Sequence, residues 1–145
     1  MATQIGRVHE FTVIGVASAT KRELVESTGA TFIESGPGVA DRVRQVSADG
    51  PDLIVDLVGG DALRAVADLV PDRTRIISAA DPDTAAELGG LALARTDEAM
   101  AKITEVIQYG LVDPRVDAQF ALDQADQAIA AVETGHAAGK IIVVP

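Results

Sequence analysis

Short, almost uniformly apolar runs alternate along this chain with segments of helical periodicity. The strongest run covers residues 53–58, and similar runs cover 11–16, 31–33, 75–78, 91–94 and 141–144. An apolar run that does not alternate with polar residues is typical of a strand covered on both faces. The alternation therefore predicts an α/β fold built on a parallel sheet with right-handed crossovers.

Helical patterns fill the intervals between these runs. Thr20 and Glu23 have the spacing of a capping box, and Gly29 stands where the helix they begin would end. Apolar stripes predict further helices over 39–46, 61–69, 97–109 and 122–132; Met100 is among the side chains expected to face inward, and Leu122 lies on the stripe of the last helix. Loops are expected at 35–38, 81–83 and 112–115. None is long enough to be a linker, so residues 1–145 are predicted to form a single domain.

The charge balance limits the classes of partner. The 145 residues include 12 Lys and Arg against 22 Asp and Glu, a formal net charge of −10, with no basic run. An acidic surface of this kind argues against nucleic acid and anionic membranes as partners. No apolar run approaches the roughly 20 residues that a membrane-spanning helix requires, and the N-terminus has no pattern of a secretion signal.

The chain contains no cysteine and two histidines, His9 and His136. The absence of cysteine excludes a disulfide framework, a thiol nucleophile and a thiolate metal site. The two histidines lie far apart and show no metal-ligand spacing, so we expect no metal. The composition fits a reducing compartment, and we predict a cytoplasmic location.

The C-terminal part of the chain resembles a known family. From Phe120 it carries Leu122, Ala125, Ala128, Glu133, Gly135, His136, Gly139, Lys140 and Ile141. This pattern is similar to the tail of the medium-chain dehydrogenase/reductase superfamily, most closely its zinc-free quinone oxidoreductase branch. Residues 13–18, Lys21, the pair 29–30 and the strand end 56–60 also resemble parts of that family's nucleotide-binding domain.

The chain also departs from the family pattern. Nothing in it corresponds to the family's catalytic domain, or to the first Rossmann strand and its glycine-rich turn. Residues 2–9 resemble the helix that follows that turn. The resemblance therefore implies a Rossmann-type parallel sheet with helices on both faces, lacking the usual first strand and glycine-rich loop.

The missing strand has a physical consequence. In a doubly wound sheet of order 3-2-1-4-5-6 the first strand is central. Without it, the strand at 11–16 and the strand at 53–58 either pair directly or receive a strand from another chain. An empty position would leave unpaired interior backbone groups, each costing roughly 1–3 kcal/mol.

The end of the strand at 11–16 carries a candidate phosphate site. A fold specific for NAD places an acidic residue there to hold the ribose 2′-hydroxyl, whereas this strand is followed by Ser18, Lys21 and Arg22. Cations at a helix N-terminus oppose the helix dipole, which is understandable if an anion binds there. We therefore expect the 2′-phosphate of NADP(H) at these residues. The alternative is two solvated surface cations.

Two neighbouring strand ends complete the candidate site. Glycines after Val58 permit close backbone approach, and the resemblance implies that Val58 and Gly59 contact the nicotinamide ribose; the alternative is a plain turn. Ser78 and Ala79 would lie at the same sheet edge, where open α/β sheets bind ligands, unless they are a simple strand end.

Other polar residues have simpler interpretations. Asp56 is either a site carboxylate or the cap of a neighbouring turn, with the cap favoured. Asp81 and Asp83 read as solvated loop residues. A proton-donor role for Tyr109, the only tyrosine, is considered but not favoured.

The resemblance implies an NADPH-dependent oxidoreductase that reduces a quinone or an activated alkene by hydride transfer without metal. This chain would supply the cofactor-binding part, and a separate chain would supply the catalytic domain. The alternative is a non-catalytic truncated remnant or interaction module. In either case we expect a homodimer formed through the edge at 91–94, because an apolar edge needs covering.

Overall fold

The computed structural model describes residues 1–134 and 139–145. Its helices are α1 (Ala2–Val8), α2 (Arg22–Ser27), α3 (Val39–Val46), α4 (Gly60–Ala67), α5 (Pro82–Glu87), α6 (Asp97–Gln108) and α7 (Ala125–Glu133). Its strands are β1 (Ile14–Ala17), β2 (Thr31–Glu34), β3 (Ile54–Asp56), β4 (Ile76–Ser78), β5 (Leu91–Ala92), β6 (Val116–Ala121) and β7 (Lys140–Val144). Short 3₁₀ turns occupy Ala19–Lys21, Arg73–Arg75 and Leu122–Gln124.

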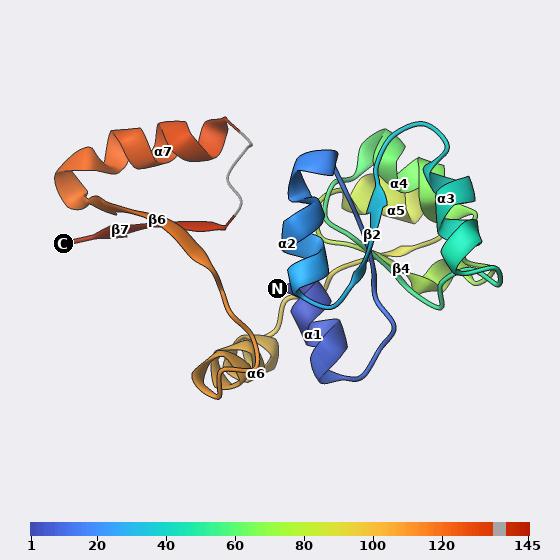
Figure 1. Ribbon diagram of the computed structural model, residues 1–145, viewed down its shortest axis with the longest axis horizontal. Coiled ribbons are helices and arrows are strands. Elements are labelled where there is room, and N and C mark those ends of the chain that lie inside the picture. Colours follow the sequence, from blue (N-terminus) through green and yellow to red (C-terminus); the bar gives the residue numbers. More distant parts are fainter. Residues whose placement is uncertain (135–138) are drawn as a thin grey trace.

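Every strand pairing is parallel, which confirms the predicted α/β fold class. The strands form a β1-β2 sheet, a β3-β4-β5 sheet and a β6-β7 sheet. The orders β2-β1 and β3-β4-β5 match a doubly wound sheet from which the strand between β1 and β3 is missing. In Figure 1, α1 and α2 lie to one side of these strands and α3, α4 and α5 to the other.

Two buried clusters hold together the part of the chain that contains β1 to β5. One joins α4, β4 and α5 through Leu63, Ala67, Val70, Ile76 and Ala85. The other joins β2 and α3 to the loop after α4 through Ile33, Val39, Val43 and Leu69, with Ile14 and Val66 packed against it. The second cluster therefore connects the two sheets by helix packing rather than by strand pairing.

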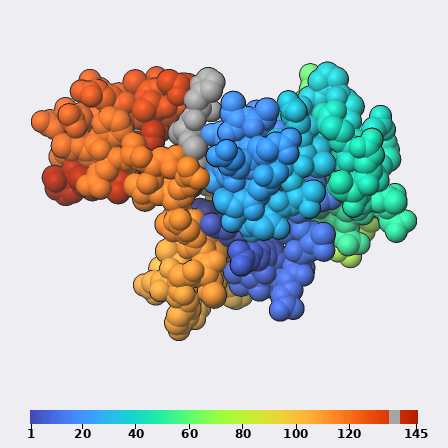
Figure 2. All heavy atoms as spheres, in the orientation of Figure 1, coloured from blue at the N-terminus to red at the C-terminus, as the bar shows by residue number. Residues whose placement is uncertain are grey.

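The last strands and helix form a separate lobe. β6 and β7 pair with an irregular register between Val116 and Ala118, and α7 packs on them through the buried Ala128. Figure 2 shows this lobe, in orange and red, projecting beside the rest of the chain. Met100 on α6 is 66% exposed, so the prediction that this side chain faces inward was wrong. Leu122, expected to begin the last helix, lies in the 3₁₀ turn before α7 and is 68% exposed.

The start of the second helix also differs from the expectation. The Thr20 hydroxyl lies 3.0 Å from that of Ser18, a 3₁₀ turn precedes α2, and α2 begins without a side-chain cap. The predicted capping box is therefore absent at this position, because Thr20 lies too early to reach the first amides of α2. Gly29 does follow the helix, with a φ of 82°.

Strand and helix limits differ elsewhere. The strand expected from Phe11 begins only at Ile14, and the Phe11 ring instead stacks against His9 with centroids 5.7 Å apart. β6 was not predicted, since 116–121 lacks a continuous apolar run. α6, by contrast, begins as predicted, with the Thr96 hydroxyl accepting from the Ala99 amide at 3.1 Å. Among the helices described, none has the length and apolar character to cross a membrane.

Candidate functional site

A buried carboxylate connects the ends of two adjacent strands. Asp56 closes β3, and its Oδ1 accepts from the Val58 amide at 3.1 Å and the Gly59 amide at 2.9 Å. Its Oδ2 accepts from the Ser78 hydroxyl at 2.6 Å. The interpretation of Asp56 as the cap of a neighbouring turn is confirmed, and the same carboxylate also fixes β4.

Ser78 completes this connection from the side of β4. Its side chain is buried, and its hydroxyl oxygen accepts from the Ala80 amide at 3.2 Å and the Asp81 amide at 2.9 Å. The hydroxyl thus has three protein partners. Ser78 therefore shapes the strand end, and the backbone at Ala79 and Ala80 is the part of this turn nearest the surface.

Asp81 fixes the glycine turn to the start of α5. Its Oδ1 accepts from the Thr84 amide at 3.0 Å and its Oδ2 from the Gly60 amide at 2.9 Å. Hydrogen bonds from Thr84 and then from the Gly60 amide lower the pKa of this carboxyl below its ordinary value of 3.8. The prediction that Asp81 is a solvated loop residue was wrong: an Asp followed by Pro82 and Thr84 is a helix N-terminus.

The two glycines of the turn after β3 differ in how much space surrounds them. Gly59 is buried with a φ of 82° and a ψ of −170°, and a Cβ there would collide with the side chain of Asp81. Gly60 also has a positive φ, of 53°, but a Cβ there would meet no atom within 4 Å. Val58, directly before these two glycines, is 75% exposed. The turn therefore has one side packed against α5 and one open backbone side.

The residues that follow β1 carry hydroxyl and basic side chains. Ser18 is exposed, Lys21 is half-buried, and no acidic residue occurs between Ala17 and Arg22. The Arg22 guanidinium lies 4.3 Å from the centroid of the Phe32 ring. It also pairs with Glu26 at 3.2 Å. Arg22 thus contacts Phe32 of β2 and Glu26 of α2, while 53% of its side chain stays exposed.

The loop after β2 is fixed by one arginine that the sequence analysis did not single out. Arg42 on α3 donates to the Glu34 carbonyl at 2.8 Å, to the Pro37 carbonyl at 2.8 Å and to the Gly36 carbonyl at 3.3 Å. This loop follows the strand paired with β1 and so lies at the same end of the sheet. The sequence did not predict this role, because Arg42 lies eight residues after the end of β2 and is not part of a periodic pattern or a motif.

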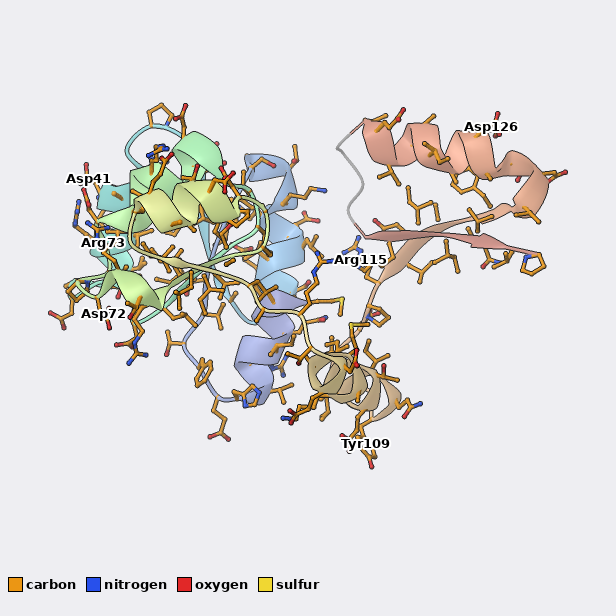
Figure 3. All side chains as sticks on the ribbon, turned by 180° about the vertical axis from the view of Figure 1, so that it is seen from behind. Asp41, Asp72, Arg73, Tyr109, Arg115 and Asp126 are labelled. Atoms are coloured by element: carbon orange, nitrogen blue, oxygen red, sulfur yellow. The ribbon has the colours of Figure 1, made fainter. Side chains whose placement is uncertain are left out.

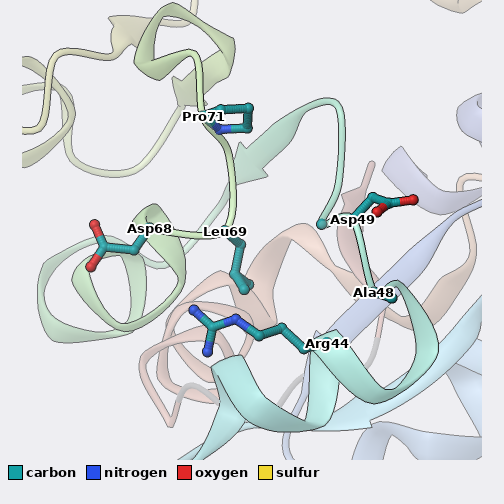
Figure 4. Close-up of a pocket in the computed structure, with 7 residues that line it drawn as sticks. Arg44, Ala48, Asp49, Asp68, Leu69 and Pro71 are labelled. Carbon is teal, nitrogen blue, oxygen red and sulfur yellow. The ribbon is translucent and has the colours of Figure 1, made fainter.

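A shallow hollow elsewhere does not contain any predicted site residue. It measures about 270 Å³ and lies between the end of α3 and the loop after α4, at the amino-terminal side of the strands (Figure 4). Two of its charged lining residues are paired within the protein: Arg44 with Asp41, and Asp68 with Arg73. Open α/β sheets bind ligands at the opposite, carboxyl side.

The remaining polar candidates lie away from the strand ends. Tyr109 caps the end of α6, is 72% exposed and points away from the protein in Figure 3. His136 lies outside the described residues. Among residues 1–134 and 139–145, no group of three or more His, Cys, Asp or Glu side chains could hold a metal ion.

The structure thus brings the predicted residues together in two groups. One group lies at the carboxyl ends of β3 and β4, where Asp56 and Asp81 bind the two turns by hydrogen bonds. It consists of Val58, Gly59, Ser78 and Ala79. Ser18, Lys21 and Arg22 lie at the carboxyl end of β1. Such a line of strand ends can present backbone amides and cations to an extended anionic ligand.

Comparisons of the sequence with known proteins give a consistent result. Residues 23–143 match the sequence family described as zinc-binding dehydrogenase. The synaptic vesicle membrane protein VAT-1 homolog of Danio rerio is 25% identical over 181 aligned positions, which cover 98% of this chain and 37% of that protein.

Comparisons of the fold agree. An NAD-dependent alcohol dehydrogenase superposes with a TM-score of 0.82 at 19% identity, covering 99% of this chain and 47% of its own. Mycobacterial Rv1454c complexed with NADPH gives 0.77 at 18% identity, with 99% and 52% covered. The quinone oxidoreductase from Coxiella burnetii gives 0.76 at 22% identity, with 98% and 47% covered. The chain therefore spans about half the length of these enzymes.

Proposed function

Because the chain belongs to the zinc-binding dehydrogenase family, we propose that it forms the cofactor-binding part of an NADPH-dependent oxidoreductase. The reaction is hydride transfer to a quinone or an activated alkene. The reduced nicotinamide supplies the hydride when bound. The chain's own residues bind and orient the dinucleotide along the carboxyl ends of β1, β3 and β4.

The observation that carries the choice of NADPH is the residue set after β1. Ser18 and Lys21 offer a hydroxyl donor and a cation, and Arg22 is held close by Phe32. An acidic residue, which would accept from a ribose hydroxyl and repel a phosphate, is absent from 17–22. We therefore assign Ser18, Lys21 and Arg22 to the 2′-phosphate.

The nicotinamide end is assigned to the second group. Gly60 and the backbone around Val58 and Ala79 leave an open side on which a ribose can approach main-chain atoms. Asp56 and Ser78 hold that backbone in place from the buried side. They act as positioning residues, because their polar atoms are already bonded to the protein.

The family description names zinc, and the described residues do not fit it. The chain has no cysteine, and residues 1–134 and 139–145 contain no cluster of potential ligands. Biological zinc sites use three or four Cys, His, Asp or Glu ligands. The proposed hydride transfer therefore uses no metal.

The substrate domain is proposed to come from another polypeptide. The lobe formed by α7 and β7 carries a shallow apolar hollow of about 260 Å³ lined by Ala128, Ile129, Val132, Glu133, Ile141 and Val143. Ile129 is 60% and Val132 is 56% exposed. Exposed apolar patches of this kind mark interaction sites, which supports docking of a domain here. The predicted cytoplasmic location is retained as part of this proposal.

A direct test uses 2′,5′-ADP, which carries the 2′-phosphate and needs no nicotinamide site. Chemical shifts of the Ser18 and Lys21 amides are followed as 2′,5′-ADP or 5′-AMP is added. We expect 2′,5′-ADP to bind at least tenfold more tightly, and Lys21→Glu to abolish the difference. Lys102→Glu on α6, at a lysine that pairs with Glu98, makes the same charge change elsewhere and should have no effect. Equal binding of both nucleotides would refute the assignment.

The second candidate function is a non-catalytic interaction module. The exposed Leu91 and Leu93 at the β5 edge favour it, because they serve association whether or not a cofactor binds. Incubation of the chain with NADPH and a benzoquinone separates the two. Nucleotide binding without oxidation at 340 nm, even after a substrate domain from a relative is added, would favour the module.

A further inference from the structure

The guanidinium of Arg42 is surrounded by the carbonyl oxygens of one loop. Residues 35–38 join β2 to α3, and we call them the β2–α3 loop. The Arg42 Nε and Nη2 donate to the Glu34 carbonyl at 3.2 and 2.8 Å. Nη1 donates to the Pro37 carbonyl at 2.8 Å, and Nη2 also lies 3.3 Å from the Gly36 carbonyl. One side chain therefore fixes the strand end and the middle of the loop together.

The backbone of this loop has little to hold it in one conformation. Gly36 and Gly38 flank Pro37 and have φ values of 106° and 75°, in a region where glycine retains much conformational freedom. Gly38 is also the N-cap of α3, and a glycine has no side chain with which to cap the helix. The shape of the β2–α3 loop therefore depends on the hydrogen bonds from Arg42.

The placement of Arg42 near the start of α3 has an electrostatic cost. A cation at this end of a helix opposes the helix dipole. The directed hydrogen bonds to loop carbonyls offset that cost, because hydrogen bonds from a charged donor are stronger than those between neutral groups. Arg42 is thus placed where only the loop gives it a role in the structure.

The β2–α3 loop begins beside the proposed 2′-phosphate site. The register of the two strands pairs Ala17 with Glu34, and the Ser35 amide donates to the Ala17 carbonyl at 2.8 Å. Ser18, one of the residues assigned to the phosphate, directly follows Ala17. In Figure 1 the loop from β2 to α3 lies at the same end of the strands as the start of α2. The loop is therefore a neighbour of the phosphate site.

Arg42 also determines which way the peptide groups of the loop point. In a trans peptide the carbonyl and the following amide point in opposite directions. The Glu34 carbonyl points to Arg42, and the Ser35 amide accordingly points to β1. The Pro37 carbonyl also points to Arg42, so the Gly38 amide is turned away from it. Arg42 thus keeps carbonyl oxygens, which would repel a phosphate, on the α3 side of the loop.

We propose that Arg42 is a positioning residue for the 2′-phosphate of NADPH. It acts through the β2–α3 loop, which it holds in one conformation with the carbonyl oxygens turned away from the phosphate. A loop that is already ordered need not lose conformational freedom when the nucleotide binds. The inference rests on the proposed function, since it concerns the same nucleotide site, and it requires no contact between Arg42 and the nucleotide.

The test compares three variants of the 145-residue chain in titrations with 2′,5′-ADP and 5′-AMP. We expect Arg42→Met to lower the preference for 2′,5′-ADP by roughly fivefold, the effect of about one misplaced hydrogen bond. Arg42→Lys keeps the charge but cannot reproduce the planar set of donors, and should lose most of the preference as well. Arg44→Met removes the same charge from the same helix, where Arg44 pairs with Asp41 at 3.0 Å, and should keep it.

A second measurement follows the loop without any nucleotide. The Ser35 amide should exchange its hydrogen about tenfold faster in Arg42→Met than in the wild type, because the loop opens more often. The amides of α4 should keep their wild-type exchange rates, which shows that the variant remains folded. Arg44→Met should leave the exchange of Ser35 unchanged.

The possible results separate this inference from the proposed function. Full preference for 2′,5′-ADP in Arg42→Lys would show that the charge alone acts, and would overturn the inference. Faster exchange of Ser35 in Arg42→Met with an unchanged preference would overturn it too, while the proposed function would stand. An equal loss in Arg44→Met would assign the effect to the charge of α3. A wild type without any preference would refute the proposed function itself, and the inference with it.

Discussion

The Ser78 hydroxyl donates to the Asp56 carboxylate over 2.6 Å in a buried position, and so joins the ends of β3 and β4. Only 1% of Ser78 and 7% of Asp56 are exposed. This pair, rather than the glycines alone, holds the turn that the nucleotide-binding proposal needs. Its removal therefore gives the first prediction.

Ser78→Ala is expected to destabilise the chain by roughly 1–3 kcal/mol, because it leaves a buried carboxylate oxygen and two turn amides without a partner. Urea denaturation followed by circular dichroism measures the change. Ser35→Ala, at an exposed loop position, is the control and should alter the free energy of unfolding by less than about 0.5 kcal/mol. Equal effects of the two substitutions would show that the Asp56–Ser78 bond does not stabilise the turn.

Gly59→Ala is expected to cost more than Gly60→Ala, although both glycines have a positive φ. Gly59 has backbone angles that only glycine adopts readily, a strain of about 1–3 kcal/mol, and its new methyl group would also collide with Asp81. Gly60→Ala adds a methyl group in open space. The comparison uses thermal melts of both variants. A larger loss for Gly60→Ala would contradict the described turn.

Asp81 predicts a specific dependence of stability on pH. Its pKa is lowered in the folded state, first by Thr84 and then by the Gly60 amide, so the unfolded state takes up the proton first as the pH falls. The stabilisation is therefore complete above the ordinary pKa of 3.8 and is lost as the pH drops through the lower folded value.

Asp81→Asn removes this carboxyl. The variant should be less stable than the wild type at pH 6, and the difference should shrink as the pH is lowered below 3.8. Denaturant midpoints of both proteins between pH 2.5 and 6 measure it. Asp83→Asn, at an exposed position on the same helix, is the charge-matched control. A constant wild-type-to-variant difference across this range would contradict the assignment.

Part of the fold and of the candidate site could be predicted from the sequence. The parallel α/β fold followed from the apolar runs, since burial on both faces leaves a composition that is visible in one sequence. The carboxyl of Asp56 could be identified as a cap because it interrupts such a run. Asp81 was misread, since its neighbour Asp83 suggested a solvated loop and its contact with Gly60 spans 21 positions.

Other predictions failed because burial and loop contacts depend on tertiary structure. Met100 and Leu122 lie on apolar stripes, but a stripe predicts burial only where a neighbouring element covers it, and both are exposed. β6 was not predicted because polar and apolar residues alternate along it and its register has one bulge. Arg42 fixes a loop through three carbonyls, which depends on tertiary placement and leaves no pattern in the sequence.

The proposed association through β5 can be tested by sedimentation. Leu91 is 52% exposed on this edge strand, and pairing of two such edges would bury it. We expect the wild type to sediment at twice 15.0 kDa and Leu91→Lys to be monomeric, because a lysine opposes burial of the edge. Leu122→Lys, at an exposed leucine of the other lobe, should leave the dimer intact. A monomeric wild type would refute this interface.

The central claim is that this chain binds NADPH and prefers it to NADH. Titration of the wild type with each reduced nucleotide, followed by nicotinamide fluorescence, tests it most directly. We predict a dissociation constant for NADPH below about 1 mM, or roughly −4 kcal/mol, and weaker binding of NADH. A dissociation constant for NADPH beyond the millimolar range, or equal affinity for the two nucleotides, would contradict the claim.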